Sequence, residues 1–254
     1  MLRWISLLLI TLVLLAGCTS NGGDDDNDDD SDTQTSIDPL EILTEASDNI
    51  RAADTFRLDV VHAGADYFAN IRLDPNTDIS LQVAIRRAVA QYVAPNELQA
   101  RVRVFGGTAI EVDVYALGDE QWLRFSSLEW TPDNFAEGFN PEVLIAEGTG
   151  FDAALAALND LRYVGEATLD TGEEVYELAG TADGIDVSAL LVGLIDMEGL
   201  VTVDVFISRD EPRYPHRIII VQADTAGEES LDPTTWTIDI YDINAESEID
   251  RPQR

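Results

Sequence analysis

From residue 55 onward the chain repeats short runs in which apolar and polar residues alternate, the period of a β-strand that buries one face. The run from Leu98 to Val104 is the clearest, and a second alternating run follows directly after Phe105-Gly106-Gly107. Two alternating runs joined by a glycine-rich turn predict a β-hairpin. Similar runs recur as far as residue 241, so the sequence predicts an α+β fold dominated by one antiparallel sheet of about ten strands.

Helical spacing of apolar residues replaces this alternation in a few segments. Asp38 can cap a first helix and Pro39 suits its first turn, which predicts a helix of about 15 residues there. Two short helices are predicted over residues 140–146 and 151–161, and a further apolar helical face over residues 185–197. These apolar stripes either fill a core or border a space that an apolar ligand could occupy. The pattern alone favours the filled core.

The first eighteen residues predict a lipoprotein signal peptide. Arg3 precedes an apolar run, residues 4–15, that is too short to cross a bilayer as a mature helix. The run ends in Leu15-Ala16-Gly17-Cys18, which resembles the lipobox of bacterial lipoproteins, where the cysteine receives a diacylglyceryl group. An ordinary secretory peptide with an incidental cysteine is the alternative. Because Cys18 is the only cysteine, we expect a protein anchored by acyl chains to the extracytoplasmic face of the cell membrane.

Residues 19–37 predict an acidic tether between this anchor and one folded body, residues 38–254. The tether contains the aspartate-rich run 24–32 and no aromatic residue, so it buries too little apolar surface to offset the entropy of ordering. A calcium loop is the alternative for this run, but it lacks the glycine turn and terminal glutamate of an EF-hand. No stretch of the body is rich enough in proline or glycine to divide it.

The charged residues exclude several functions. Forty-nine acidic and fifteen basic residues give a net charge of −34, which opposes nucleic-acid binding through phosphate contacts. Because every basic residue is an arginine, lysine-based Schiff-base and P-loop chemistry have no residue to use. A single cysteine excludes an intramolecular disulfide and a cysteine-based zinc site. We therefore predict neither a metal nor a cofactor.

Motifs of common enzymes are also missing from the sequence. The two histidines, His62 and His216, belong to neither a Gly-x-Ser-x-Gly elbow nor an HExxH motif. Carboxylate pairs such as Glu173-Glu174 carry little information in so acidic a chain. The sequence therefore predicts a protein that is not an enzyme.

Four runs of the body follow one another in a recognisable order. The first is Ala94-Pro95-Asn96-Glu97-Leu98-Gln99-Ala100, and the second is Leu117-Gly118-Asp119-Glu120-Gln121-Trp122 with Trp130. The third covers residues 140–150 and begins with Asn140-Pro141, and the last is Trp236-Thr237-Ile238-Asp239-Ile240-Tyr241-Asp242. Behind a lipobox, this order resembles the mycobacterial LppX/LprA/LprF/LprG lipoprotein family over roughly residues 38–252. Residues 205–208 depart from it, since a tryptophan and an acidic residue are expected there.

The resemblance implies a LolA-like fold, a curved half-barrel sheet with helices on its concave face. It also implies an apolar cavity that binds the acyl chains of a lipid or glycolipid, which the protein would carry or display in the cell envelope, with a transport partner there as a further expectation. A surface-displayed interaction or sensor protein with a filled core is the alternative. The residues expected to line the cavity are apolar groups of the predicted helices and facing strands, namely Trp122, Phe125, Phe135, Phe139, Leu144, Phe151, Leu155, Leu158, Leu190, Leu191 and Leu194.

Overall fold

The computed structural model describes residues 37–72, 80–125, 128–133, 139–191, 195, 197–227 and 232–253. Its strands are β1 (Thr55–Ala63), β2 (Phe68–Arg72), β3 (Ser80–Val93), β4 (Glu97–Phe105), β5 (Ala109–Leu117), β6 (Glu120–Phe125), β7 (Thr131–Pro132), β8 (Asn159–Thr168), β9 (Glu174–Asp183), β10 (Leu200–Ser208), β11 (Pro215–Gln222) and β12 (Thr234–Tyr241). Its helices are α1 (Pro39–Arg51), α2 (Gly150–Ala156) and α3 (Gly184–Val187), with 3-10 turns η1 (Pro141–Leu144), η2 (Ser188–Leu191) and η3 (Ala223–Thr225).

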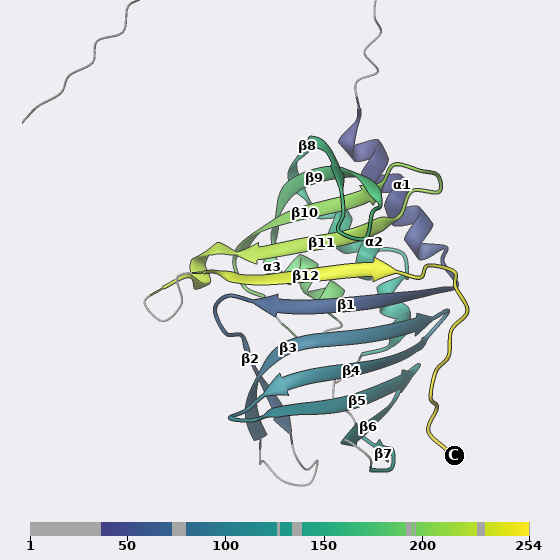
Figure 1. The fold of residues 1–254 in the computed structure, drawn as a ribbon, viewed down its shortest axis with the longest axis vertical. Coiled ribbons are helices and arrows are strands. Elements are labelled where there is room, and N and C mark those ends of the chain that lie inside the picture. Colours follow the sequence, from purple (N-terminus) through teal and green to yellow (C-terminus); the bar gives the residue numbers. More distant parts are fainter. Residues whose placement is uncertain are drawn as a thin grey trace, which may run out of the picture. The chain divides into compact units, whose positions relative to one another are not determined.

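The strands form one antiparallel sheet (Figure 1). Within the described residues, eleven strands follow one another in the order β7-β6-β5-β4-β3-β1-β12-β11-β10-β9-β8, and β2 pairs with β3 beside this path. The edge strands β7 and β8 do not pair with each other there, so the sheet stays open. Figure 1 shows α2 and α3 behind the strands, on one face of the sheet. The predicted antiparallel α+β half-barrel is confirmed.

The first helix begins where its capping residues predict. Asp38 accepts a hydrogen bond from the backbone N–H of Leu40 at 2.9 Å, and Pro39 occupies the first turn. One side of α1 buries Ile42, Ala46 and other apolar groups of the core. A carboxylate cap and a proline that needs no N–H partner favour this start over any later one.

The predicted helix over residues 151–161 is too long. The helix α2 ends at Ala156, and the strand β8 begins at Asn159. Asp160 has a φ of 51°, a left-handed conformation that a right-handed helix does not tolerate. The strand β8 was not predicted, because the apolar helical spacing continues into it as far as Leu161, and β9 was not predicted either.

Three aromatic rings join the helices to the sheet. Phe56 of β1 stacks on Tyr92 of β3 at 4.7 Å between ring centroids, and meets Phe151 of α2 edge-on at 5.8 Å. All three side chains are fully buried, and the Tyr92 hydroxyl donates to the carbonyl oxygen of Pro95 at 2.6 Å. Offset and edge-on ring pairs add stability beyond the area they bury, so this cluster fixes α2 against the strands.

The chain after β12 crosses the ends of strands β1, β3 and β4 as an extended strap. Arg251 donates from Nε and Nη2 to the Glu97 carboxylate at 2.7 and 2.9 Å, and Asp250 accepts from Arg124 at 2.7 Å. Glu97 also accepts from the Tyr115 hydroxyl at 2.8 Å. The strap is therefore held by charged hydrogen bonds to a carboxylate that is largely buried.

Removing the Phe151 ring should destabilise the fold strongly. We expect Phe151→Ala to lower the free energy of unfolding by about 3–5 kcal/mol, because it leaves a cavity between α2 and β1. Ile185→Ala is the matched control, since Ile185 is largely exposed and its loss should cost less than about 0.5 kcal/mol. Urea unfolding followed by circular dichroism measures both, and equal midpoints would contradict the packing described.

The strap should stabilise the fold only above mildly acidic pH. The hydrogen bond from Arg251 holds the pKa of Glu97 below its ordinary value of 4.5. A lowered pKa in the folded state gives stability that is complete above pH 4.5 and is lost as the pH falls through the folded-state value. Urea unfolding of Arg251→Gln should show a deficit at neutral pH that shrinks below pH 4.5. Arg209→Gln, whose partner carboxylates are exposed, should show no such trend.

Candidate functional site

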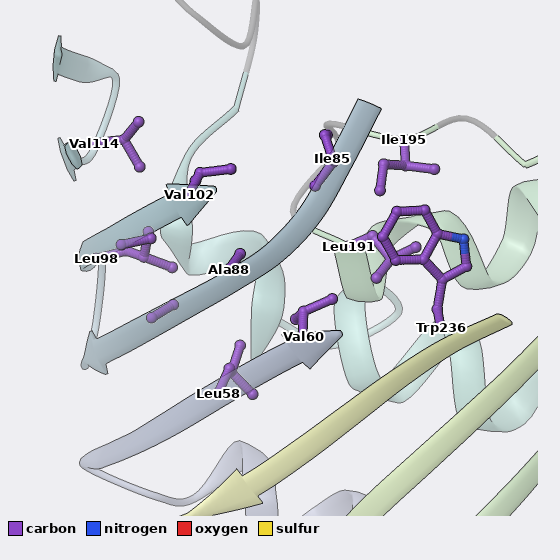
Figure 2. Close-up of a pocket in the computed structure, with 12 residues that line it drawn as sticks. Leu58, Val60, Ile85, Ala88, Leu98, Val102, Val114, Leu191, Ile195 and Trp236 are labelled. Atoms are coloured by element: carbon purple, nitrogen blue, oxygen red, sulfur yellow. The ribbon is translucent and has the colours of Figure 1, made fainter. Parts of the chain in front are cut away.

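An apolar cavity lies against the inner face of β1, β3, β4 and β5 (Figure 2). Alternation along each strand points every second side chain into it, and the register aligns these side chains across the sheet. Leu58 lies opposite Ala90, which lies opposite Ala100, which lies opposite Val114. The strand residues that line it are Leu58, Val60, Ile85, Ala88, Ala90, Leu98, Ala100, Val102 and Val114.

Small side chains create this space. Ala88, Ala90 and Ala100 face inward at positions where the neighbouring strands carry leucine or valine. A methyl group reaches less far from the sheet than those side chains, so a gap remains between the strands and the layer that covers them. The cavity thus lies over three alanines of β3 and β4, of which Ala90 and Ala100 are paired and Ala88 lies opposite Val102.

Three larger side chains cover the cavity. Figure 2 shows Leu191, Ile195 and Trp236 grouped on one side, across from Leu98 and Val102 of β4. Leu191 ends η2, whereas Trp236 belongs to β12. The cover therefore combines a rigid strand residue with the end of a short 3-10 turn.

The cavity is dry and small. Every lining residue is apolar apart from the indole N–H, and the volume is about 40 Å³. A water molecule occupies about 30 Å³ of liquid, and pockets for drug-sized ligands occupy about 300–1,000 Å³. The described structure therefore has the chemistry of an apolar binding site, but an acyl chain requires the cover to move away from the strands.

Polar groups lie beside the tryptophan at one end of the cavity. The His62 ring packs 4.6 Å from the Trp236 ring, and its Nε2 lies 3.0 Å from the Ala65 carbonyl oxygen, to which the Nε2–H tautomer donates. His62 Nδ1 and Trp236 Nε1 are both buried with no hydrogen-bond partner among the described residues. Burial lowers the pKa of His62, so its ring is neutral at physiological pH.

The residues predicted to line a lipid cavity lie in several environments. Leu191 lines the cavity described above. Phe139, Leu144, Phe151, Leu155 and Leu190 are buried in the surrounding core. Their contact with a bound lipid stays a prediction.

The remaining predicted residues lie further from this cavity or outside the described residues. Leu158 is half-buried and borders a surface depression beside α1. Trp122 packs 5.3 Å from Tyr115, and the exposed Phe125 borders a depression at the tip of β5. Phe135, Leu194 and Cys18 lie outside the described residues.

None of the strand residues that line the cavity was predicted, because the prediction took large apolar residues of the helices and of later strands as the lining. One signal was present in the sequence. Inward positions of two neighbouring strands carry alanine in place of the larger residues usual in a core, as Ala88, Ala90 and Ala100 do. Only the register shows that Ala90 and Ala100 are adjacent.

Two solved structures share this fold. LprF from Mycobacterium bovis has a TM-score of 0.61 at 14% sequence identity, over 84% of this chain and 96% of LprF. LppX from Mycobacterium tuberculosis has a TM-score of 0.54 at 16% identity, over 84% of this chain and 98% of LppX. At such identities the likeness concerns the fold alone. No curated protein matches the sequence.

The sequence itself carries the family assignment. Among the described residues, no helix has the length and apolar character needed to cross a membrane. The sequence profile of the LppX_LprAFG lipoprotein family matches residues 38–249, which include the whole sheet and all the helices described. The chain therefore belongs to the LppX_LprAFG lipoprotein family.

Proposed function

We propose that this protein is a lipid-anchored, extracytoplasmic lipoprotein that binds the acyl chains of a lipid or glycolipid and carries or displays them in the cell envelope. The observation that supports this most is the apolar lining of the inner sheet face, where alanines border a small cavity. Membership of a lipoprotein family agrees with this chemistry. No catalytic group is needed, because binding and release of an acyl chain break no bond.

Loading requires the cavity to grow. At about 40 Å³ it holds no acyl chain, so the side chains of Leu191 and Ile195 would have to move away from β4. Burying an acyl chain of about 16 carbons contributes more than about 10 kcal/mol of gross free energy, at about 0.8 kcal/mol per CH₂. That gain is large enough to offset the separation of a few apolar contacts.

The proposed organisation places this binding body on a tether. Residues 1–18 would be a signal peptide ending in the lipidated Cys18, residues 19–37 an acidic linker, and residues 38–254 the binding domain. A linker of this length spans roughly 60 Å when fully extended. The body could then reach lipids or an envelope partner without leaving the membrane.

One observation favours a second function. The small volume of the cavity fits a filled core, in which case the protein would be a surface-displayed interaction or sensor protein without lipid cargo. Native mass spectrometry separates the two functions. Residues 37–254, expressed in a bacterium and purified without detergent, should carry about one lipid per chain, and organic extraction would identify its class. A mass without lipid that also stays unchanged after lipid is added would favour the interaction protein.

Filling the cavity should abolish loading. Ala90 lies opposite Ala100 inside the cavity, so the ring of Ala90→Phe would occupy the space proposed for the acyl chain. We expect at least about a tenfold loss of bound lipid, with overpacking costing about 1–3 kcal/mol of stability.

Val89→Phe is the matched control for this variant. Val89 is the preceding residue and points to the opposite, exposed face of β3, so the same ring there should leave loading unchanged. Native mass spectrometry and circular dichroism would be measured for both variants. Equal lipid content in two folded variants would contradict the cavity assignment.

A further inference from the structure

The hairpin of β3 and β4 carries a net positive charge, whereas the chain as a whole is strongly negative. Residues 80–105 contain four arginines and only one acidic residue, Glu97, within a chain whose net charge is −34. The register places Arg87 opposite Arg103. The same pairing places Val89 opposite Arg101, and all four side chains share the outer face of the sheet.

Two of the three arginines of this face stand further out than the carboxylates that pair with them, whereas Arg103 and its partner Glu111 are similarly exposed, at 55% and 49%. Arg101 is 61% exposed, whereas its partner Asp113, at 2.7 Å, is only 9% exposed. Arg87 is 51% exposed, against 19% for its partner Asp59. At Arg87 and Arg101, solvent therefore meets the guanidinium groups, while the counterions of these two arginines lie closer to the sheet.

Two exposed phenylalanines continue the same face to the tip of the hairpin. Phe68 of β2 and Phe105 of β4 both lie opposite Ala84 of β3, so the two rings flank that residue on one face. Phe68 is 52% exposed and Phe105 is 45% exposed. Phe105 follows Arg103 by two residues and so lies on the arginine side of β4.

We propose that this Arg–Phe face, made of Phe68, Arg87, Val89, Arg101, Arg103 and Phe105, docks on the surface of a membrane that contains anionic lipids. The exposed guanidinium groups attract lipid phosphates while they stay paired with carboxylates of the sheet, and aromatic rings insert at the level of the headgroups. Because the rest of the body is strongly acidic, an anionic bilayer repels its other faces and selects this one. Charge complementarity thus fixes both the partner and the orientation.

The proposed tether that precedes the body is long enough to allow docking on a membrane. In the proposed organisation, the tether from Cys18 to residue 37 keeps the body within roughly 60 Å of a bilayer. Docking itself needs no cargo in the cavity, so it can be tested whether or not lipid loading succeeds.

A vesicle-capture experiment on the full chain tests the proposal. The chain is reconstituted into neutral phosphatidylcholine vesicles, which are then mixed with fluorescent vesicles that contain phosphatidylglycerol or only phosphatidylcholine. We expect the anionic vesicles to be captured at least about tenfold better, with capture falling steeply at high salt.

Two matched double variants locate the contact. Arg101→Gln with Arg103→Gln should lower capture by about 25-fold, at roughly fivefold for each charge. The fold should persist, because Asp113 keeps its bonds from Arg124 at 2.8 and 3.1 Å. Arg162→Gln with Arg209→Gln removes the same charge from β8 and the end of β10, and should leave capture within about twofold of the original chain.

Phe105→Ser provides an independent measurement in which no charge changes. It should weaken the part of capture that survives high salt, because that part comes from ring insertion. Equal capture of neutral and anionic vesicles, or equal loss in the two double variants, would overturn the proposal. Aggregation of the protein-bearing neutral vesicles alone would also overturn it, by showing that the face binds a second copy of the chain.

Discussion

The whole structure depends on burial of the inner face of a sheet that does not close. An antiparallel sheet with free edges exposes one apolar face unless another layer covers it, and helices supply that layer here. Where the cover is rich in large side chains, as at Phe151 and Leu190, the packing is complete. Where the strands present alanines beneath the end of η2, a gap remains. The volume of the side chains thus decides whether the covered face forms a filled core or leaves a cavity.

The hairpin of β3 and β4 carries two different surfaces because a strand alternates. Inward residues of both strands, Ala88, Ala90, Ala100 and Val102, line the cavity. At alternate positions, Arg87, Arg101 and Arg103 point toward solvent. A shift of the register by one residue would exchange the two faces and place guanidinium groups in the core. Because the inner face must be apolar, the charged residues of these strands have to occupy the alternate positions, on the outer face.

Local patterns allowed the elements to be predicted where those patterns were strong. The cap at Asp38 locates α1, and the glycines after Phe105 locate the turn between β4 and β5. The strand β8 was missed because its sequence continues an apolar helical spacing, and only the left-handed residue Asp160 and pairing with β9 end the helix. The inward alanines of β3 and β4 are a local signal of the cavity, but local sequence does not show where the cavity lies. Its walls meet through register between strands, and its cover comes from Leu191 and Trp236, far away in the chain.

Different interactions hold the two ends of the cavity, and under the proposed function this difference determines at which end the cavity would open. Beside Trp236, the turn after β1 is bound to the start of β12, because Ala65 donates to the carbonyl of Asp232 at 3.0 Å and accepts from the Thr234 hydroxyl at 2.9 Å. The two segments also approach each other closely at Gly64, because a Cβ atom on this residue would lie 1.9 Å from the Pro233 carbonyl oxygen. The 3-10 turn η2 is held at its start, where Ser188 donates to the Gly184 carbonyl at 2.8 Å and accepts from the N–H of Met197 at 2.9 Å. Leu191, at the other end of this turn, covers the cavity through apolar contacts alone. Apolar contacts have no preferred direction and can be exchanged for those of an acyl chain, whereas breaking the hydrogen bonds at the other end would leave buried polar groups unpaired. For the proposed function, the opening therefore belongs on the side of η2, and Trp236 forms the fixed end of the site.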